Sequence, residues 1–204
     1  MSGPRDGAPA GQTRAQDAYA LGRNPAEADR LGRQSLELWR LAEAVLDRVR
    51  LRPGQRAIDL GCGPRGIVDL LSERVGPGGQ VVGLDRDPAL VDRARALVTA
   101  CGLTNVDVVA GDARHTELPS STFDLVHTRT LLVNIPDPAE VVTEMTRLAR
   151  PGGWVVAVEP DLTGLLCHPP LPAWDRPKSA PSSIQPATRA GPSAWTWCAA
   201  CAPR

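Results

Sequence analysis

An excess of one charge and long apolar runs are both missing from this chain of 204 residues. Lysine plus arginine and aspartate plus glutamate each number 23, so there is no net charge for binding a polyanion. No basic run is interleaved with aromatic residues, as a nucleic-acid surface would require. No stretch approaches the roughly 18 apolar residues of a membrane span, and residues 1–20 lack the apolar centre of a signal peptide. We therefore expect a cytoplasmic protein whose partners include neither nucleic acid nor membrane.

Cysteine is also sparse. The five cysteines are widely scattered, which fits reduced thiols better than a disulfide framework. Cys198 and Cys201 have a spacing found in zinc and redox sites, but a single such pair in a segment without regular pattern is weak evidence. We expect no metal site.

The composition along the chain predicts one domain between two unstructured ends. Residues 1–18 are rich in Gly, Pro, Ala and polar residues, with almost nothing to bury, and we expect a disordered leader there. Residues 19–176 are long enough for one sizeable core. Residues 177–204 contain five prolines, seven alanines and four serines, with no helix or strand period, and predict a disordered tail.

The apolar pattern between these ends alternates between helix and strand. One amphipathic helix is expected over residues 26–51. We expect it mainly to cover the core, although Tyr19, Arg23 and Gln34 are also candidates for covering a nearby pocket. Further helices are expected after the proline-containing caps at Asp87 and Asp137. Strands apolar on both faces are expected from residue 57 and over residues 80–84, 106–110, 123–128 and 154–158. This order predicts an α/β fold with a Rossmann-like parallel sheet and helices on both faces.

The first strand ends in a glycine turn. Gly61, Gly63 and Gly66 follow Asp59, and a helical pattern begins at Ile67. Glycine permits positive φ and lets a ligand lie against the main chain, while a helix N-terminus presents free N–H groups. This spacing alone is a weak signal, because a purely structural turn would have the same spelling.

Other chemically unusual residues fall at the ends of the following strands. Asp85, Asp112 and Thr128 each stand where an expected strand finishes. In a parallel sheet these ends share one rim, which is where ligands bind. The sequence therefore predicts that these residues and Gly61 lie close together.

Taken together, these segments resemble a class I S-adenosylmethionine-dependent methyltransferase of the family that acts on small molecules. The resemblance covers residues 19–160 and rests on five motifs: Asp59-Leu60-Gly61-Cys62-Gly63, Asp85, Gly111-Asp112-Ala113, Phe123-Asp124-Leu125-Val126 and Pro151-Gly152-Gly153. It implies methyl transfer to a small-molecule acceptor, with S-adenosyl-L-methionine as cofactor.

The resemblance also implies roles for particular residues. Asp59 would hold the turn or the cofactor amino group, Asp85 the two ribose hydroxyls, and Asp112 the adenine amine. The residues implied to bind the cofactor are Asp59, Gly61, Cys62, Gly63, Asp85, Arg86, Asp112, Ala113, Thr128 and Arg129. Asp85 and Asp112 also have purely structural interpretations: Asp85 as a helix N-cap or surface acid, and Asp112 as the cap of a turn.

No catalytic base is evident. His127 and His115 are weak candidates, because packing in a strand or loop explains a lone histidine equally well. Many relatives carry a histidine where this chain has Asn134. The catalytic residues therefore stay unknown at this stage.

The chain departs from the family pattern after residue 176. Two further strands of the methyltransferase fold are missing, which suggests a truncated or frame-shifted C-terminus. The outer edge of the strand Trp154–Val158 should then be unpaired, and we expect self-association through it. Two other functions stay open: a non-catalytic cofactor-binding or partner-completed subunit, and an NAD-dependent oxidoreductase, since the glycine spacing also fits a dinucleotide.

Overall fold

The computed structural model describes residues 25–160 and, for the backbone, residues 195–201. The expected leader, the first residues of the domain and most of the expected tail lie outside this range. No helix in the described part of the chain is both long and apolar enough to cross a membrane.

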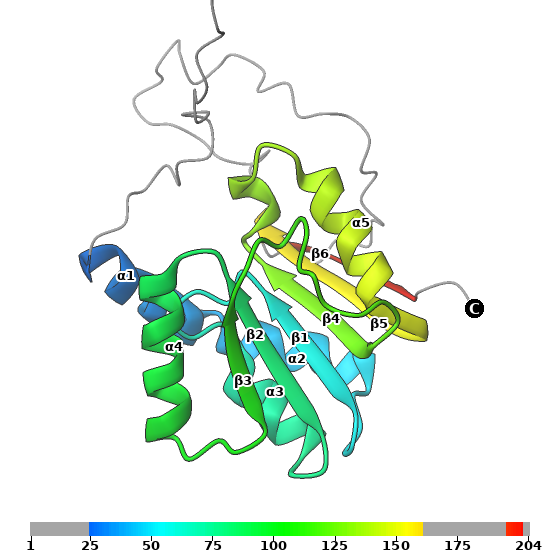
Figure 1. Ribbon diagram of the computed structural model, residues 1–204, viewed down its shortest axis with the longest axis horizontal. Helices are drawn as coiled ribbons and strands as arrows, with labels where there is room; N and C mark the ends of the chain where they lie inside the picture. The colour runs from blue at the N-terminus through cyan, green and yellow to red at the C-terminus, as the bar shows by residue number, and fades with distance from the viewer. Residues whose placement is uncertain (1–24, 161–194, 202–204) are drawn as a thin grey trace, which may run out of the picture.

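Five parallel strands form the centre of the molecule (Figure 1). Their order is β3-β2-β1-β4-β5, so the α/β parallel sheet expected from the sequence is confirmed. Their bounds are Arg56–Leu60 for β1, Gln80–Asp85 for β2, Val106–Ala110 for β3, Phe123–Arg129 for β4 and Ala149–Pro160 for β5. Chain order and spatial order reverse at β1, so β1 and β4 flank the switch point where such sheets bind ligands.

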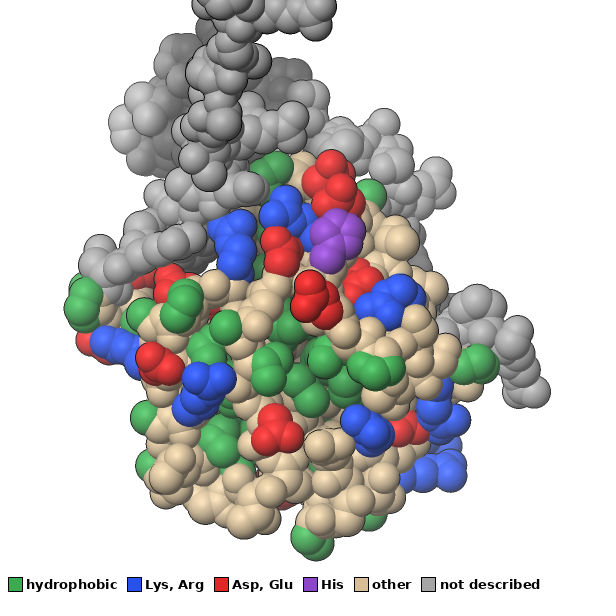
Figure 2. All heavy atoms as spheres, in the orientation of Figure 1, with side chains coloured by type: hydrophobic (Ala, Val, Ile, Leu, Met, Phe, Trp, Pro, Cys, Tyr) green, Lys and Arg blue, Asp and Glu red, His purple; other side chains and the backbone are tan. Residues whose placement is uncertain are grey.

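Helices cover both faces of the sheet. On one face α2 (Trp39–Val49), α3 (Val68–Val75) and α4 (Pro88–Ala100) pack on alternate strand residues such as Val81 and Leu125. On the other face α5 (Pro138–Leu148) packs on Ile58 and Val126. Hydrophobic side chains also gather between α4 and α5 on the face seen in Figure 2, where none of the described helices covers the strands. The two apolar faces of the strands thus require the two helical layers.

The single helix expected over residues 26–51 is wrong in detail. The structure has two helices, α1 (Pro25–Glu37) and α2, separated at Leu38. Val45 and Leu46 on α2 are buried in the core, whereas α1 contributes to the cavity described below. The two helices therefore pack in different places, α2 in the core and α1 at the cavity. The apolar period continues across the break, so the sequence pattern alone does not reveal the break.

The expectation of an open edge at Trp154–Val158 is also wrong. Strand β6 (Trp195–Cys201) pairs antiparallel with β5, with Val156 opposite Ala199 (Figure 1). The strand begins with Trp195, Thr196 and Trp197, residue types favoured in strands. An apolar edge strand gains backbone hydrogen bonds from any extended segment beside it, which is the physical reason for the pairing.

Candidate functional site

A cavity of about 880 Å³ opens at the carboxyl ends of the parallel strands. It lies between α1, the glycine turn and the segments that follow β2, β3 and β4. Nine of the ten residues expected to bind the cofactor line it: Asp59, Gly61, Cys62, Gly63, Asp85, Arg86, Asp112, Ala113 and Arg129. Thr128 is not in the lining, because it is fully buried and its hydroxyl donates to the Leu60 carbonyl at 2.9 Å.

Asp59 fixes the glycine turn through a hydrogen bond to its last part. Its Oδ2 accepts from the backbone N–H of Ile67 at 3.0 Å, and its Oδ1 lies 2.7 Å from His127 Nδ1. An ionised carboxylate can only accept, so His127 Nδ1–H is the donor. Gly66 has φ of 56°, and a Cβ there would overlap Asp59 Oδ2. The turn therefore requires glycine at this position for both conformation and space.

Cys62 is a packing residue within the turn. Its side chain is buried, and a Cβ on Gly83 of the neighbouring strand would lie 3.1 Å from its sulfur. Burial, reinforced by the negative charges of Asp59 and Asp85, raises the pKa of the Cys62 thiol well above its usual value. The thiol is therefore neutral and is not an activated nucleophile.

Asp85 ties the glycine turn to the start of α4. Its Oδ2 accepts from Gly63 N at 2.8 Å and its Oδ1 from Asp87 N at 2.9 Å. Asp87 in turn caps α4 by accepting from Ala89 N. Burial is the largest influence and raises the pKa of Asp85, while the two backbone donors oppose it. Asp85 lines the cavity, and a carboxylate oxygen that accepts one hydrogen bond can accept a second from a ligand hydroxyl.

Asp112 forms a close ion pair beside the cavity. Arg114 Nη2 lies 2.7 Å from its Oδ2, and the backbone N–H of Arg114 donates to Oδ1 at 2.9 Å. The hydrogen bonds from Arg114 lower the pKa of Asp112, so the group is ionised at neutral pH. Ala113 is buried beside it and lines the same part of the cavity.

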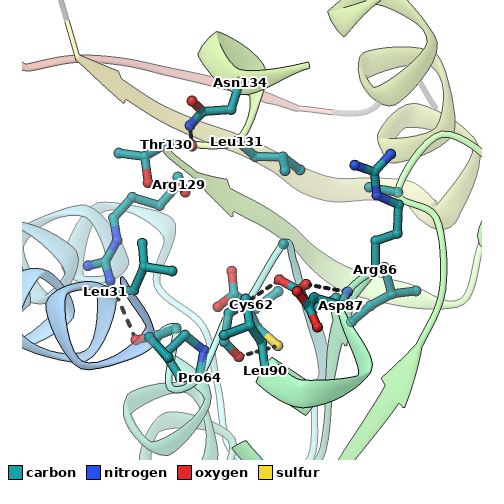
Figure 3. A pocket seen from close by; sticks show the side chains of 18 of the residues that line it. Leu31, Cys62, Pro64, Arg86, Asp87, Leu90, Arg129, Thr130, Leu131 and Asn134 are labelled. Carbon is teal, nitrogen blue, oxygen red and sulfur yellow. Dashed lines mark hydrogen bonds between the residues drawn. The ribbon is translucent and has the colours of Figure 1, made fainter. Parts of the chain in front are cut away.

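Arg129 crosses from the end of β4 toward the glycine turn (Figure 3). Its Nη2 donates to Ser35 Oγ on α1 at 3.0 Å and to the Gly66 carbonyl at 3.5 Å. Its Nη1 is buried and has no hydrogen-bond partner among the described residues. Burial lowers the pKa of Arg129, and the nearby charges of Asp59 and Asp69 oppose that shift, so the guanidinium stays charged. A charged, unpartnered donor beside a cavity is suited to an anionic ligand group.

The two histidines considered as bases, His115 and His127, do not line the cavity. His127 is buried in β4 against Asp59, and His115 is exposed in the loop after β3, where it bridges to Asp112. The described lining contains no histidine. Asn134 does line the cavity, and its Nδ2 donates to the Thr130 carbonyl at 2.7 Å.

Sequence reasoning missed several residues of the cavity wall. From α1, Leu31 and Ser35 line it beside Gln34, and from the segment after β4, Leu131 and Val133 do. Nothing in the sequence marks the α1 residues as cavity-lining, because their spacing is that of an ordinary apolar stripe facing the core. Leu131 and Val133 follow the fourth strand directly, so the rule that marked Asp85 and Asp112 would have included them.

Comparison with known proteins gives the family. A family model described as a methyltransferase domain matches residues 51–199. The demethylmenaquinone methyltransferase of Geobacillus kaustophilus (strain HTA426) is 38% identical over 121 residues, 59% of this chain and 51% of that protein. The nocamycin O-methyltransferase of Saccharothrix syringae is 36% identical over 134 residues, 66% of this chain and 46% of that protein. The chain thus spans about half the length of these relatives.

A solved structure agrees with the sequence matches. A SAM-dependent methyltransferase from Aquifex aeolicus superposes with a TM-score of 0.62 at 25% identity, covering 69% of this chain and 74% of that one. Together with the family match and the sheet order, this shows that the chain belongs to the class I S-adenosylmethionine-dependent methyltransferases. The family membership argues against the nicotinamide-dependent alternative.

Proposed function

We propose that this chain binds S-adenosylmethionine in the cavity and transfers its methyl group to a small-molecule acceptor. The observation that carries the proposal is the cavity itself, which brings a glycine turn, two carboxylates and a buried guanidinium together at one rim. These groups come from separate segments of the chain, as the family resemblance implied.

The residues present fit the cofactor chemically. Asp85 offers two carboxylate oxygens to a vicinal diol, and Asp112 with Ala113 provides an acceptor and an apolar contact for a purine. The unpartnered Nη1 of Arg129 fits the carboxylate of an amino-acid moiety at the other end of the turn. Gly61 and Gly63, both at positive φ, allow the ligand to approach the main chain.

When bound, the cofactor supplies a methyl group on a sulfonium, which is already activated for in-line displacement. The task of the chain is then to hold both reactants in line and to exclude water, an effect worth several kcal/mol. Neither His127 nor His115 lines the cavity, so we infer that neither of these two histidines acts as the base. An acceptor that is itself nucleophilic fits this arrangement.

Transfer of an isotopically labelled methyl group from S-adenosylmethionine to a panel of quinols, phenols and amines tests the proposal. Formation of a labelled product by the 204-residue chain supports a small-molecule methyltransferase. Cofactor binding without transfer to any acceptor would contradict the catalytic half and favour a cofactor-binding or partner-completed subunit. Failure to bind the cofactor at all would overturn the whole proposal.

A further inference from the structure

The segment that follows β4 leaves the sheet through a strained residue. Thr130 has φ of 53°, a conformation that β-branched residues rarely adopt. Its N–H donates to the Val158 carbonyl at 2.9 Å, and its own carbonyl accepts from Asn134 Nδ2. Such strain persists only where the surroundings fix the backbone, and it is concentrated at functional sites.

Glu159, near the end of β5, provides the strongest of these constraints. Its Oε1 accepts from Leu131 N at 3.1 Å and from Leu132 N at 3.0 Å, and its Oε2 accepts from Val133 N at 3.3 Å. These N–H groups stand at the start of the short 3-10 helix η2 (Leu132–Asn134), where the helix itself offers them no acceptor. Burial raises the pKa of Glu159, and the three backbone donors oppose that shift. One carboxylate thus orients three consecutive peptide groups.

The side chains held in this way form one wall of the cavity. Leu131 and Val133 line it, while Glu159 itself does not, because its carboxylate faces the backbone. Leu131 also lies on the glycine turn, since a Cβ at Gly61 would come within 2.7 Å of Leu131 Cδ1. The cavity-lining residues of this segment and its neighbour on β5 carry no charge: Thr130, Leu131, Val133, Asn134, Ile135, Pro136 and Pro160. An uncharged wall next to the glycine turn fits an uncharged, largely apolar ring.

We propose that Glu159 is a positioning residue for the acceptor: it holds the backbone of Leu131–Val133, so that the side chains of Leu131 and Val133 form the apolar wall on which an uncharged ring compound lies. This inference rests on the proposed function, because it assigns the part of the cavity lined by Asp85 and Asp112 to the cofactor. Glu159→Gln keeps the size of the side chain but replaces one accepting oxygen by an NH₂ group that faces backbone donors. The wall should then loosen while the cofactor contacts stay in place.

The test compares the full chain with Glu159→Gln and with Glu73→Gln, an exposed glutamate on α3. Amide hydrogen exchange at residues 131–133 should speed up at least about tenfold in Glu159→Gln alone, because one accepting oxygen is lost and the NH₂ group that replaces it repels the backbone donors. The Kd of S-adenosylhomocysteine should change by less than about twofold, and the Kd of 1,4-naphthoquinone for the S-adenosylhomocysteine-loaded protein should rise at least about fivefold.

Each of the other outcomes contradicts a particular part of the proposal. Unchanged exchange at residues 131–133, or exchange that rises throughout the protein, overturns the positioning role. Fast local exchange with unchanged naphthoquinone affinity shows that the segment does not hold the acceptor. If the wild-type chain binds S-adenosylhomocysteine but no naphthoquinone, the acceptor class is wrong, whereas if it does not bind S-adenosylhomocysteine, the proposed function fails and the exchange result still stands.

Discussion

Gly66 is a residue on which the shape of the glycine turn depends strongly. It combines a φ of 56° with a position where any Cβ would overlap Asp59 Oδ2. Gly63, in the same turn, has a φ of 58° and open space around its missing Cβ. The two glycines therefore separate the cost of backbone strain from the cost of a steric clash.

We predict that Gly63→Ala lowers the free energy of unfolding by about 1 to 2 kcal/mol, the cost of a left-handed conformation for alanine. Gly66→Ala should cost about 3 kcal/mol or more, because it adds displacement of the buried Asp59 carboxylate to that strain. Urea unfolding of both variants measures the difference. Equal losses would show that Asp59 moves aside freely and that it does not fix the turn.

Single residues also show where sequence reasoning ends. The identity of Asp59, Asp85 and Asp112 as rim residues follows from their position at or just after the ends of buried strands. Their partners do not: His127 lies 68 residues from Asp59, and Gly63 lies 22 residues from Asp85. Pairings at such separations arise from strand order, which a single sequence does not specify. Glu159 shows the same limit, although an acid near the end of a strand was the signal that identified Asp85.

Among the elements, the loop after β3 is anchored to α5 by one buried carboxylate. Glu144 Oε1 accepts from both the backbone N–H and the hydroxyl of Thr116, and Arg147 Nη2 lies 2.6 Å from the same oxygen. The hydrogen bonds from Arg147, followed by those from Thr116, lower the pKa of Glu144 from 4.5 to about 2. This loop follows Asp112 and Ala113, so the anchor also supports that side of the cavity.

The lowered pKa gives a pH dependence of stability with a defined sign. The unfolded chain takes up this proton at higher pH than the folded chain, so the stabilisation is complete above about pH 4.5 and is lost as the pH falls toward 2. We predict that Glu144→Gln lowers the free energy of unfolding by about 2 kcal/mol at neutral pH, the cost of a buried charge-assisted network. The difference from wild type should shrink near pH 3.

Urea unfolding of both proteins at neutral and acid pH measures this difference. Glu140→Gln, at an exposed position in the same helix, serves as control and should change stability by less than about 0.5 kcal/mol. A gap between wild type and Glu144→Gln that is the same at both pH values would contradict the assigned role.

Strand β6 covers the outer edge of the sheet. A chain ending at residue 194 would leave the outer edge of β5 without its antiparallel partner. We predict that this deletion causes concentration-dependent self-association in size-exclusion chromatography, because unpaired backbone groups on an apolar strand template further pairing. A deletion variant that elutes as a monomer at all concentrations would show that β6 does not protect the edge.

Most of the elements could be predicted because the strands are rich in apolar residues and most are bounded by Gly, Pro or a capping Asp. β6 could not be, since its seven residues stand in a segment of low-complexity composition without alternation. The break at Leu38 was hidden for another reason. The bonds from Leu38 N to Gln34 O and from Ala42 N to Leu38 O continue the helical pattern across it, so the interruption leaves no trace in the periodicity.

For the whole molecule, the central claim is that the cavity at the sheet rim is a cofactor site built around Asp85. Isothermal titration of the full chain with S-adenosylhomocysteine tests it most directly, using Asp85→Asn and, as control, Asp92→Asn at an exposed position on α4. We predict one saturable site in the wild type, an affinity about 10 to 100 times weaker in Asp85→Asn, as expected for a lost charged hydrogen bond, and no change in Asp92→Asn. An absence of binding at about millimolar ligand, or equal affinity of wild type and Asp85→Asn, would contradict the account.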